Sequence, residues 1–292
     1  LVDEIAKVRK SGFTFAPEAG TTRLRDVINK PVDQDKFFEI IEDVFRRGWR
    51  TVKFYFMLGL PTETDEDLMG IVDICDKAAK LGRRYHGNRT RVNVTLSPFV
   101  PKCNTPFQWE AQPLPDELER RYQLVRGEVR GRCGHRVDIK TADTRAAFLE
   151  SVLARGDRRV SAVVRRAWEL GARLDGWSEK FQFETWMQAF RDVGLNPVWY
   201  SARDRDEAEI LPFDHIESNV GRRFLWADQR RARRQHVVDK CDTGRCAGCE
   251  VCNDLFDHTM ADNMLERAHV GPAGKPVQRG RSEAMAENPS IP

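Results

Sequence analysis

Residues 51–58 read Thr-Val-Lys-Phe-Tyr-Phe-Met-Leu, and residues 59–64 continue Gly-Leu-Pro-Thr-Glu-Thr. The first run is rich in aromatic and branched side chains, which predicts a β-strand. A glycine and a proline in the second run predict a turn. Thr64, with Asp67 three positions later, resembles a capping box and predicts the start of a helix of about 17 residues. Strand, turn and helix in this order form the repeating unit of a parallel α/β fold.

The same order recurs on both sides of this stretch. Residues 12–16 predict a short strand, residues 33–47 predict a helix capped by Asp33, and residues 92–96 predict a third strand. Three such strands cannot close a barrel, but they suit the second half of a (β/α) barrel. Functional loops in such a barrel follow the carboxyl ends of the strands. Here those loops contain Glu18, Gly59–Glu63 and Ser97–Pro101.

Helical patterns replace this alternation from about residue 114, with helices expected at 144–154, 160–170 and 183–193. Residues after 268 are rich in glycine and proline, which predicts a disordered tail. We therefore divide the chain into a half-barrel (1–113), a helical extension (114–235), a four-cysteine module (236–267) and a tail (268–292).

The chain has 292 residues, of which 40% are hydrophobic and 32% charged, as in ordinary globular proteins. No apolar run approaches the ~18 residues that would cross a bilayer, so no membrane partner is expected. The first residues, Leu1–Glu4, are neither a methionine nor a signal region. They read as mid-sequence, and we expect an N-terminal part of a parent protein to be missing.

Positive charge is concentrated rather than abundant. The net charge of +3 is too small to imply a nucleic-acid partner by itself. Six arginines lie close together at positions 222, 223, 230, 231, 233 and 234. A solvated helix face is favoured over an RNA- or phosphate-binding face for this run.

Seven cysteines, an odd number without a secretion signal, favour a reducing compartment and a cytoplasmic protein. Cys75 lies on the apolar face of a predicted helix, where it fits as a small core residue. Four cysteines lie within 12 residues and predict one metal centre: Cys241, Cys246, Cys249 and Cys252. Zinc and a [4Fe–4S] cluster both fit four thiolates, with iron–sulfur slightly favoured.

Several motifs carry a family resemblance in the expected order. Residues 16–25 (Ala-Pro-Glu-Ala-Gly-Thr-Thr-Arg-Leu-Arg) and residues 57–64 (Met-Leu-Gly-Leu-Pro-Thr-Glu-Thr) resemble the fourth and fifth strand motifs of cobalamin-binding-type radical S-adenosylmethionine (SAM) proteins. Residues 100–109 look like the segment after their sixth strand. Glu150, Arg155–Arg159 and Trp168 resemble an uncharacterised subfamily that fuses a cobalamin-type domain, a radical SAM barrel and a helical extension.

The resemblance covers about residues 1–255 and has two kinds of departure. Phe213 stands where tryptophan is expected, and residues 217–220 replace a glycine-containing run. The family's Cys-x3-Cys-x2-Cys motif, which holds its catalytic cluster and precedes the fourth strand, does not occur here. The resemblance therefore implies that this chain is the C-terminal part of a partial TIM barrel. It also implies that the cluster ligands and any cobalamin domain lie in the missing part, so that the fragment alone is inactive.

The resemblance, together with the loop positions, implies a set of SAM-binding residues. Glu18 would accept hydrogen bonds from the ammonium or ribose of SAM, and Thr21 or Thr22 would add a hydroxyl. Arg23 or Arg25 would bind its carboxylate. Gly20 would permit close backbone approach. The remaining members of the set are Gly59 and Pro61 as a turn against the adenine, Glu63 as a brace of that loop, and Ser97. A salt bridge is the competing interpretation for Glu18, and a purely structural turn is the competing interpretation for Gly59 and Pro61.

Two functions follow as hypotheses. The first is a radical SAM enzyme, a methyltransferase or a rearrangement catalyst, with a [4Fe–4S] cluster and an unknown substrate for which RNA or a ribonucleoprotein is conceivable. The second is a non-catalytic module that binds RNA or a protein partner and has a zinc or iron–sulfur cysteine site. No catalytic residue is assigned. His215 beside Asp214 is a candidate acid–base or substrate residue, but an ordinary histidine in a turn at a helix start is the favoured interpretation.

Overall fold

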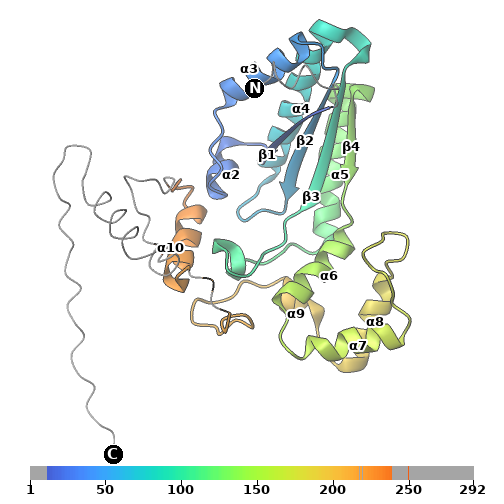
Figure 1. The fold of residues 1–292 in the computed structure, drawn as a ribbon, viewed down its shortest axis with the longest axis vertical. Helices are drawn as coiled ribbons and strands as arrows, with labels where there is room; N and C mark the ends of the chain where they lie inside the picture. The colour runs from blue at the N-terminus through green and yellow to red at the C-terminus, as the bar shows by residue number, and fades with distance from the viewer. Residues whose placement is uncertain (1–11, 217, 219, 239–248, 250–292) are drawn as a thin grey trace, which may run out of the picture. The chain divides into compact units, whose positions relative to one another are not determined.

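A computed structural model describes residues 12–216, 218, 220–238 and 249. Its centre is a four-stranded parallel sheet in the order β1-β2-β3-β4 (Figure 1). The strands are β1 (Phe13–Glu18), β2 (Thr51–Leu58), β3 (Arg91–Pro98) and β4 (Val137–Thr141). The predicted α/β class is confirmed.

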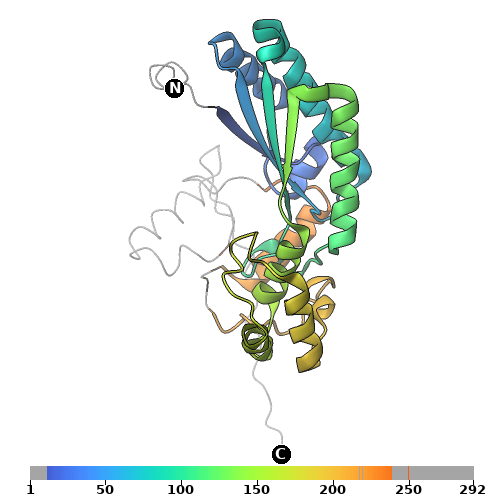
Figure 2. The same ribbon diagram turned by 90° about the vertical axis from the view of Figure 1, so that its right-hand side faces the viewer.

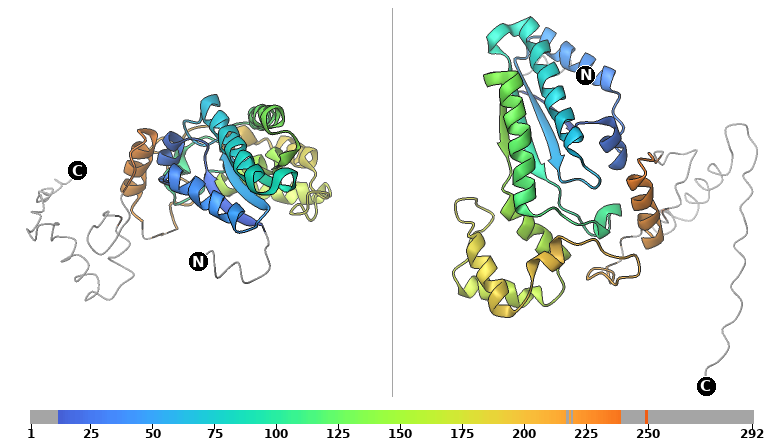
Figure 3. Two further views of the ribbon diagram at one scale, coloured as in Figure 1. Left: turned by 90° about the horizontal axis from the view of Figure 1, so that it is seen from above. Right: turned by 180° about the vertical axis from the view of Figure 1, so that it is seen from behind.

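Three helices connect consecutive strands: α3 (Gln34–Arg46), α4 (Asp65–His86) and α5 (Pro115–Cys133). Because the strands are parallel and lie in sequence order, crossovers of one hand place all three helices on the same face of the sheet. Figures 2 and 3 show this one-sided arrangement. The core lies between the helices and that face, and includes Val44, Val52, Phe54, Ile71 and Val94.

The sheet extends beyond the boundary predicted at residue 113. Strand β4 pairs with β3, with Val92 opposite Val137. Helix α5 contributes Tyr122, Val125 and Val129 to the same core as the strands. Residues 114–141 therefore belong with the sheet, not with the helical extension. With only five residues, β4 is too short for its alternation to stand out in the sequence.

Local signals place the helix starts well. Asp33 caps α3 by accepting hydrogen bonds from the N–H groups of Asp35 and Lys36, as predicted. Thr64 and Asp67 form the expected capping box at α4. That helix has 22 residues and is longer than predicted.

A second core belongs to the helical extension. It lies among α6 (Thr144–Arg155), α7 (Val160–Glu169), α8 (Phe183–Val193) and α9 (Pro197–Ser201), close to the predicted ranges for the first three. Val152, Val163, Ala167 and Phe190 are almost completely buried there. The remaining helices among the described residues are α2 (Thr22–Val27), α10 (Arg222–Arg233) and three short 3-10 helices at Gly87–Arg89, Pro106–Trp109 and Gly134–Arg136.

The chain divides into two compact units. One comprises residues up to 217 together with 225–238, and it contains the sheet and the helices α2 to α9. The other comprises 218–224 and 239–292. In the second unit the described residues include a hydrogen bond from the Gly221 N–H to the Cys249 carbonyl at 3.3 Å. Most of the predicted cysteine module and all of the predicted tail lie outside the described residues. No helix in the described part of the chain is long and apolar enough to cross a membrane.

Candidate functional site at the open face of the sheet

The side chains of β2 alternate between the two faces of the sheet. Val52, Phe54 and Phe56 point to the helices and are buried, whereas Lys53 and Tyr55 lie on the opposite face and are exposed. The register continues this face across the sheet, because Lys53 lies beside Asn93 and Tyr55 beside Thr95. Parallel sheets are usually covered on both faces by apolar contacts. A polar, exposed face on such a sheet is therefore a candidate binding surface.

The open face is polar over all four strands. It carries Thr14, Lys53, Tyr55, Met57, Asn93, Thr95, Ser97, Asp138 and Lys140. Of these residues, only Ser97 was predicted from the sequence to bind SAM. The alternation of Lys53, Tyr55 and Met57 with buried residues was the signal that could have identified the others.

The carboxyl ends of the strands bring the predicted loops together. Glu18 pairs in register with Phe56, and Ser97 pairs with Met57. The loops after β1, β2 and β3 thus start from one edge of the sheet, as the sequence predicted.

Glu18 ends β1 in the left-handed region, with φ 64°. Its carboxylate forms an ion pair with the Lys30 ammonium at 2.9 Å, and about a quarter of the Glu18 side chain is exposed. The competing interpretation as a salt-bridge residue therefore describes its contacts here.

Thr21 and Arg23 bind a protein carboxylate rather than an open site. Asp67 is 2% exposed, and it accepts hydrogen bonds from the Thr21 hydroxyl and the Arg23 guanidinium. Burial opposes ionisation of Asp67, but these bonds hold its pKa below the usual value. Arg23 also donates to the Thr62 carbonyl at 2.8 Å. Both side chains therefore fasten the loop after β1 to the start of α4.

Gly20 is required by a close approach between backbones. A Cβ at this position would lie 2.2 Å from the Asp67 carbonyl oxygen and 2.4 Å from the Ile71 nitrogen. A Cβ on Gly70 would in turn lie 2.8 Å from Gly20. The close contact expected from Gly20 is thus a contact with α4.

Glu63 braces the loop after β2, as predicted. Its carboxylate accepts the Gly59 N–H at 2.7 Å and pairs with Arg121 at 2.6 Å, and 1% of its side chain is exposed. Burial raises the pKa of Glu63 to about 7, against the opposing effects of the Gly59 N–H and Arg121. Gly59 has φ 84°, which favours glycine, and Pro61 is buried. The turn interpretation therefore accounts for both Gly59 and Pro61.

Arg25 is also committed to structure. Its side chain is 2% exposed and donates to the Ala19 carbonyl at 3.0 Å and to the Thr22 hydroxyl at 3.1 Å. Burial lowers its pKa. The candidate site is consequently the open face, with Met57 and Ser97 at its carboxyl edge and Tyr55 farther down the same face, and the predicted loop residues hold its rim.

The metal prediction falls mainly outside the described residues, which include Cys249 but not Cys241, Cys246 or Cys252. Within the part that the structure describes, no three His, Cys, Asp or Glu side chains are grouped as metal ligands. Cys75 is completely buried, which confirms it as a core residue, and burial raises the pKa of its thiol.

Comparison with known proteins finds one distant relative. The chain is 27% identical to the uncharacterized protein MJ0966 of Methanocaldococcus jannaschii over 198 residues, which are 67% of this chain and 41% of that protein. The match thus spans less than half of the relative's length. No model of a known protein family matches the chain. No solved structure matches it significantly.

Proposed function

We propose that the sheet is part of the SAM-binding barrel of a radical SAM enzyme and that its open face is the barrel interior. The observation that supports this proposal is the parallel sheet with helices on one face and polar side chains on the other. This is the arrangement of strands in a (β/α) barrel, whose ligands lie at the carboxyl ends of the strands. The substrate is not assigned.

The residues at the carboxyl edge suit the adenosyl part of SAM. Ser97 offers a hydroxyl, the partly exposed Glu18 carboxylate offers an acceptor for ribose hydroxyls, and Met57 offers an apolar surface for the adenine. Tyr55 and Lys140 lie farther down the same face and would contact the substrate. Thr21, Arg23 and Arg25 are reassigned from ligand contact to holding the rim, where Glu63 braces the loop after β2 as expected.

The described residues do not fit a [4Fe–4S] cluster at the sheet. Cys75 and Cys133 are buried between helices and sheet, and Cys103 is exposed. When bound, such a cluster supplies the electron that cleaves the sulfonium, while the protein binds and orients the reactants. No role in that step is assigned to a residue of this chain.

Two substitutions on one strand test the proposal. Residues 93 and 97 lie on the same face of β3, four positions apart, near its amino end and at its carboxyl edge. Ser97→Phe should place a bulky ring at the carboxyl edge of the open face. It should therefore weaken binding of SAM and of S-adenosylhomocysteine by at least about tenfold. Asn93→Phe adds the same bulk away from the edge and should leave the affinity nearly unchanged.

Isothermal titration calorimetry on the full chain measures both affinities, and circular dichroism verifies folding. The proposal fails if the wild-type chain binds neither compound. It also fails if the two phenylalanine variants weaken binding equally.

The alternative function, a non-catalytic RNA-binding module, draws on helix α10. Arg223, Arg230 and Arg231 of this helix and Arg234 directly after it are exposed, whereas Arg233 is held by the buried Glu110 carboxylate at 2.6 Å. This alternative predicts that a single-stranded RNA binds the chain with a steep salt dependence, and that replacing these four exposed arginines by serine abolishes the binding. Fluorescence anisotropy with a labelled oligonucleotide measures it.

A further inference from the structure

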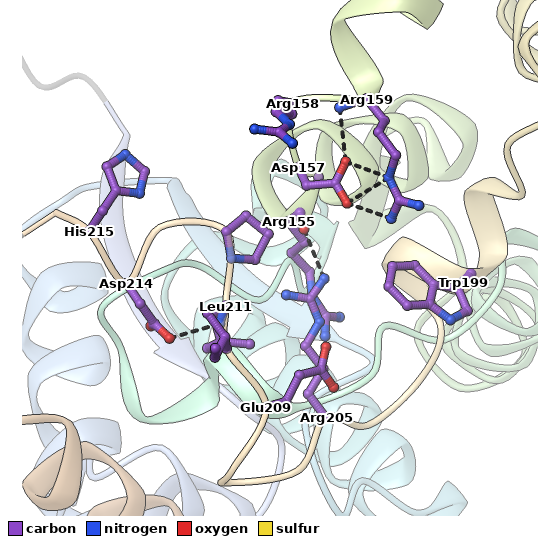
Figure 4. A pocket seen from close by; sticks show the side chains of 13 residues that line it. Arg155, Asp157, Arg158, Arg159, Trp199, Arg205, Glu209, Leu211, Asp214 and His215 are labelled. Atoms are coloured by element: carbon purple, nitrogen blue, oxygen red, sulfur yellow. Dashed lines mark hydrogen bonds and ion pairs between the residues drawn. The ribbon is translucent and has the colours of Figure 1, made fainter.

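A cavity of about 800 Å³ lies in the helical extension, and no residue of the open face of the sheet lines it. It is formed by the turn between α6 and α7, by Trp199 of α9 and by residues 205–215 (Figure 4). None of the predicted SAM-binding residues lines it. The arginines at positions 155, 158, 159 and 205 give it a basic lining.

Two of these arginines are buried together. Arg155 is 1% exposed and Arg205 is 5% exposed. Arg155 donates to the Ser201 carbonyl at 2.7 Å, and Arg205 donates to the Arg155 carbonyl at 2.8 Å. The acceptors are neutral backbone groups, so they do not offset the two positive charges.

Both guanidinium groups retain unused donors. The Nε atoms of Arg155 and Arg205 and the Nη1 atom of Arg205 are buried without a hydrogen-bond partner. Burial, followed by the repulsion from Arg205 and Arg203, lowers the pKa of Arg155 to about 10. Buried charges without counterions and buried donors without acceptors are costly, and proteins rarely retain them without a compensating ligand.

The nearby carboxylates have other partners. Asp157 pairs with Arg159 at 2.6 Å, and Glu209 pairs with Arg203 at 2.5 Å. Asp214 accepts the Leu211 N–H at 2.7 Å. Within the described ranges, no carboxylate lies in ion-pair contact with Arg155 or Arg205. Glu209 attracts both guanidinium groups through space, but it is already paired with Arg203, so the two buried arginines retain an excess of positive charge.

Trp199 adds an aromatic surface beside the arginines. Its side chain is 46% exposed, and the Arg203 guanidinium lies 4.2 Å from the centre of its ring. The Arg159 guanidinium also lies 5.9 Å from the centre of this ring, and the exposed part of the ring offers an aromatic surface to a planar ring of a ligand.

We propose that this cavity binds a nucleotide, with its phosphate on Arg155, Arg158 and Arg205 and its base against Trp199. A phosphate carries about two negative charges and several acceptor oxygens, which match several guanidinium donors better than a single carboxylate does. Arg158 lies at the turn between α6 and α7. Its side chain is exposed, so its guanidinium is accessible to the phosphate as a third positive charge.

The first test uses inorganic phosphate and adenosine 5′-monophosphate as probes of the full chain. Both should raise the melting temperature in a phosphate-free buffer, since a ligand that binds only the folded state stabilises it. Adenosine 5′-monophosphate should bind at least about tenfold more tightly than phosphate if its base stacks on Trp199. Equal affinities would overturn the assignment of Trp199, and the absence of binding by both probes would overturn the site.

Substitutions locate the site. Arg205→Met should weaken binding of both probes by about 10- to 100-fold, the loss expected for hydrogen bonds to a charged group. Arg158→Met should weaken binding of both probes by several-fold. Because Arg158 is exposed, this substitution leaves the core intact and tests the site even if Arg205→Met does not fold. Trp199→Ala should weaken binding of adenosine 5′-monophosphate but leave the affinity for inorganic phosphate unchanged.

Arg165→Met is the matched control, because Arg165 lies on α7 with 82% of its side chain exposed. Its affinity for both probes should equal that of the wild type. If Arg205→Met and Arg158→Met bind the probes as tightly as this control, the cavity is not the binding site.

Discussion

At the scale of single residues, Glu63 is the most informative titratable group. Its carboxylate is buried between the Gly59 N–H and the Arg121 guanidinium, at the turn that follows β2. Although it has a cationic partner, burial raises its pKa to about 7 from an ordinary value of 4.5. The folded chain therefore binds this proton more tightly than the unfolded chain does.

Glu63 should make stability depend on pH. Because its pKa is higher in the folded state, stability rises as the pH falls, and we expect a gain of about 1 kcal/mol between pH 8 and pH 6. Glu63→Gln should remove this gain in urea unfolding. Glu117→Gln should keep it, because the hydrogen bond from Arg120 holds the pKa of Glu117 at about 2, outside this range. An unchanged pH dependence in Glu63→Gln would contradict the prediction.

Gly20 is expected to tolerate no side chain. Gly20→Ala would press a methyl group onto backbone atoms of α4 and should destabilise the chain by about 3 kcal/mol. Gly127→Ala is the control, since a Cβ on this exposed α5 residue meets nothing within 4 Å. It should stabilise by about 0.5–1 kcal/mol. Thermal unfolding of both variants measures the contrast, and equal effects would show that the approach of Gly20 to α4 is not as described.

At the scale of elements, Gln112 joins the sheet to the helical extension. Its side chain is 1% exposed and donates to the Phe99 carbonyl at 2.9 Å and to the Ala147 carbonyl at 3.3 Å. It also accepts the Ser201 hydroxyl at 3.1 Å. One amide thus connects the loop after β3 with α6 and α9.

Loss of this amide should loosen the extension. Gln112→Ala leaves buried carbonyl groups without hydrogen-bond donors, and it should lower the free energy of unfolding by about 2 kcal/mol. It should also speed amide hydrogen exchange in α9 more than in β2 or β3. Gln188→Ala removes an exposed glutamine of α8 and should change neither quantity. If the α9 amides exchange as slowly in Gln112→Ala as in the wild type, Gln112 does not join the two parts.

At the scale of the whole molecule, the four clustered cysteines remain a prediction. We expect one metal ion or cluster per chain at Cys241, Cys246, Cys249 and Cys252, because ligands so close in sequence close only short loops on binding. Elemental analysis of the anaerobically purified chain measures the metal, and a broad visible absorbance distinguishes iron–sulfur from zinc. Cys246→Ser should lower the metal content, whereas Cys103→Ser should not. Equal metal content in both variants would refute the site.

Elements whose signals are local could be placed from the sequence. The alternation and composition of residues 51–58 place β2, and the side chains of Asp33 and Thr64 place the starts of α3 and α4. These signals depend on residues a few positions apart, so they can be recognised in the sequence before the fold is known. The α/β class follows from the order of such elements, and so does the convergence of the loops at one edge of the sheet.

Only the tertiary structure decided what the polar side chains of those loops contact. Asp67 lies 44 positions from Arg23, and Glu63 lies 58 positions from Arg121, yet each pair is in contact. The family resemblance predicted that Arg23 binds the carboxylate of SAM, and no local pattern in the sequence could reveal that its partner is Asp67. The same holds for Arg155 and Arg205, which are 50 positions apart and share one hydrogen bond. Burial and charge pairing depend on the sum of contacts between distant segments, and these exist only once the chain has folded.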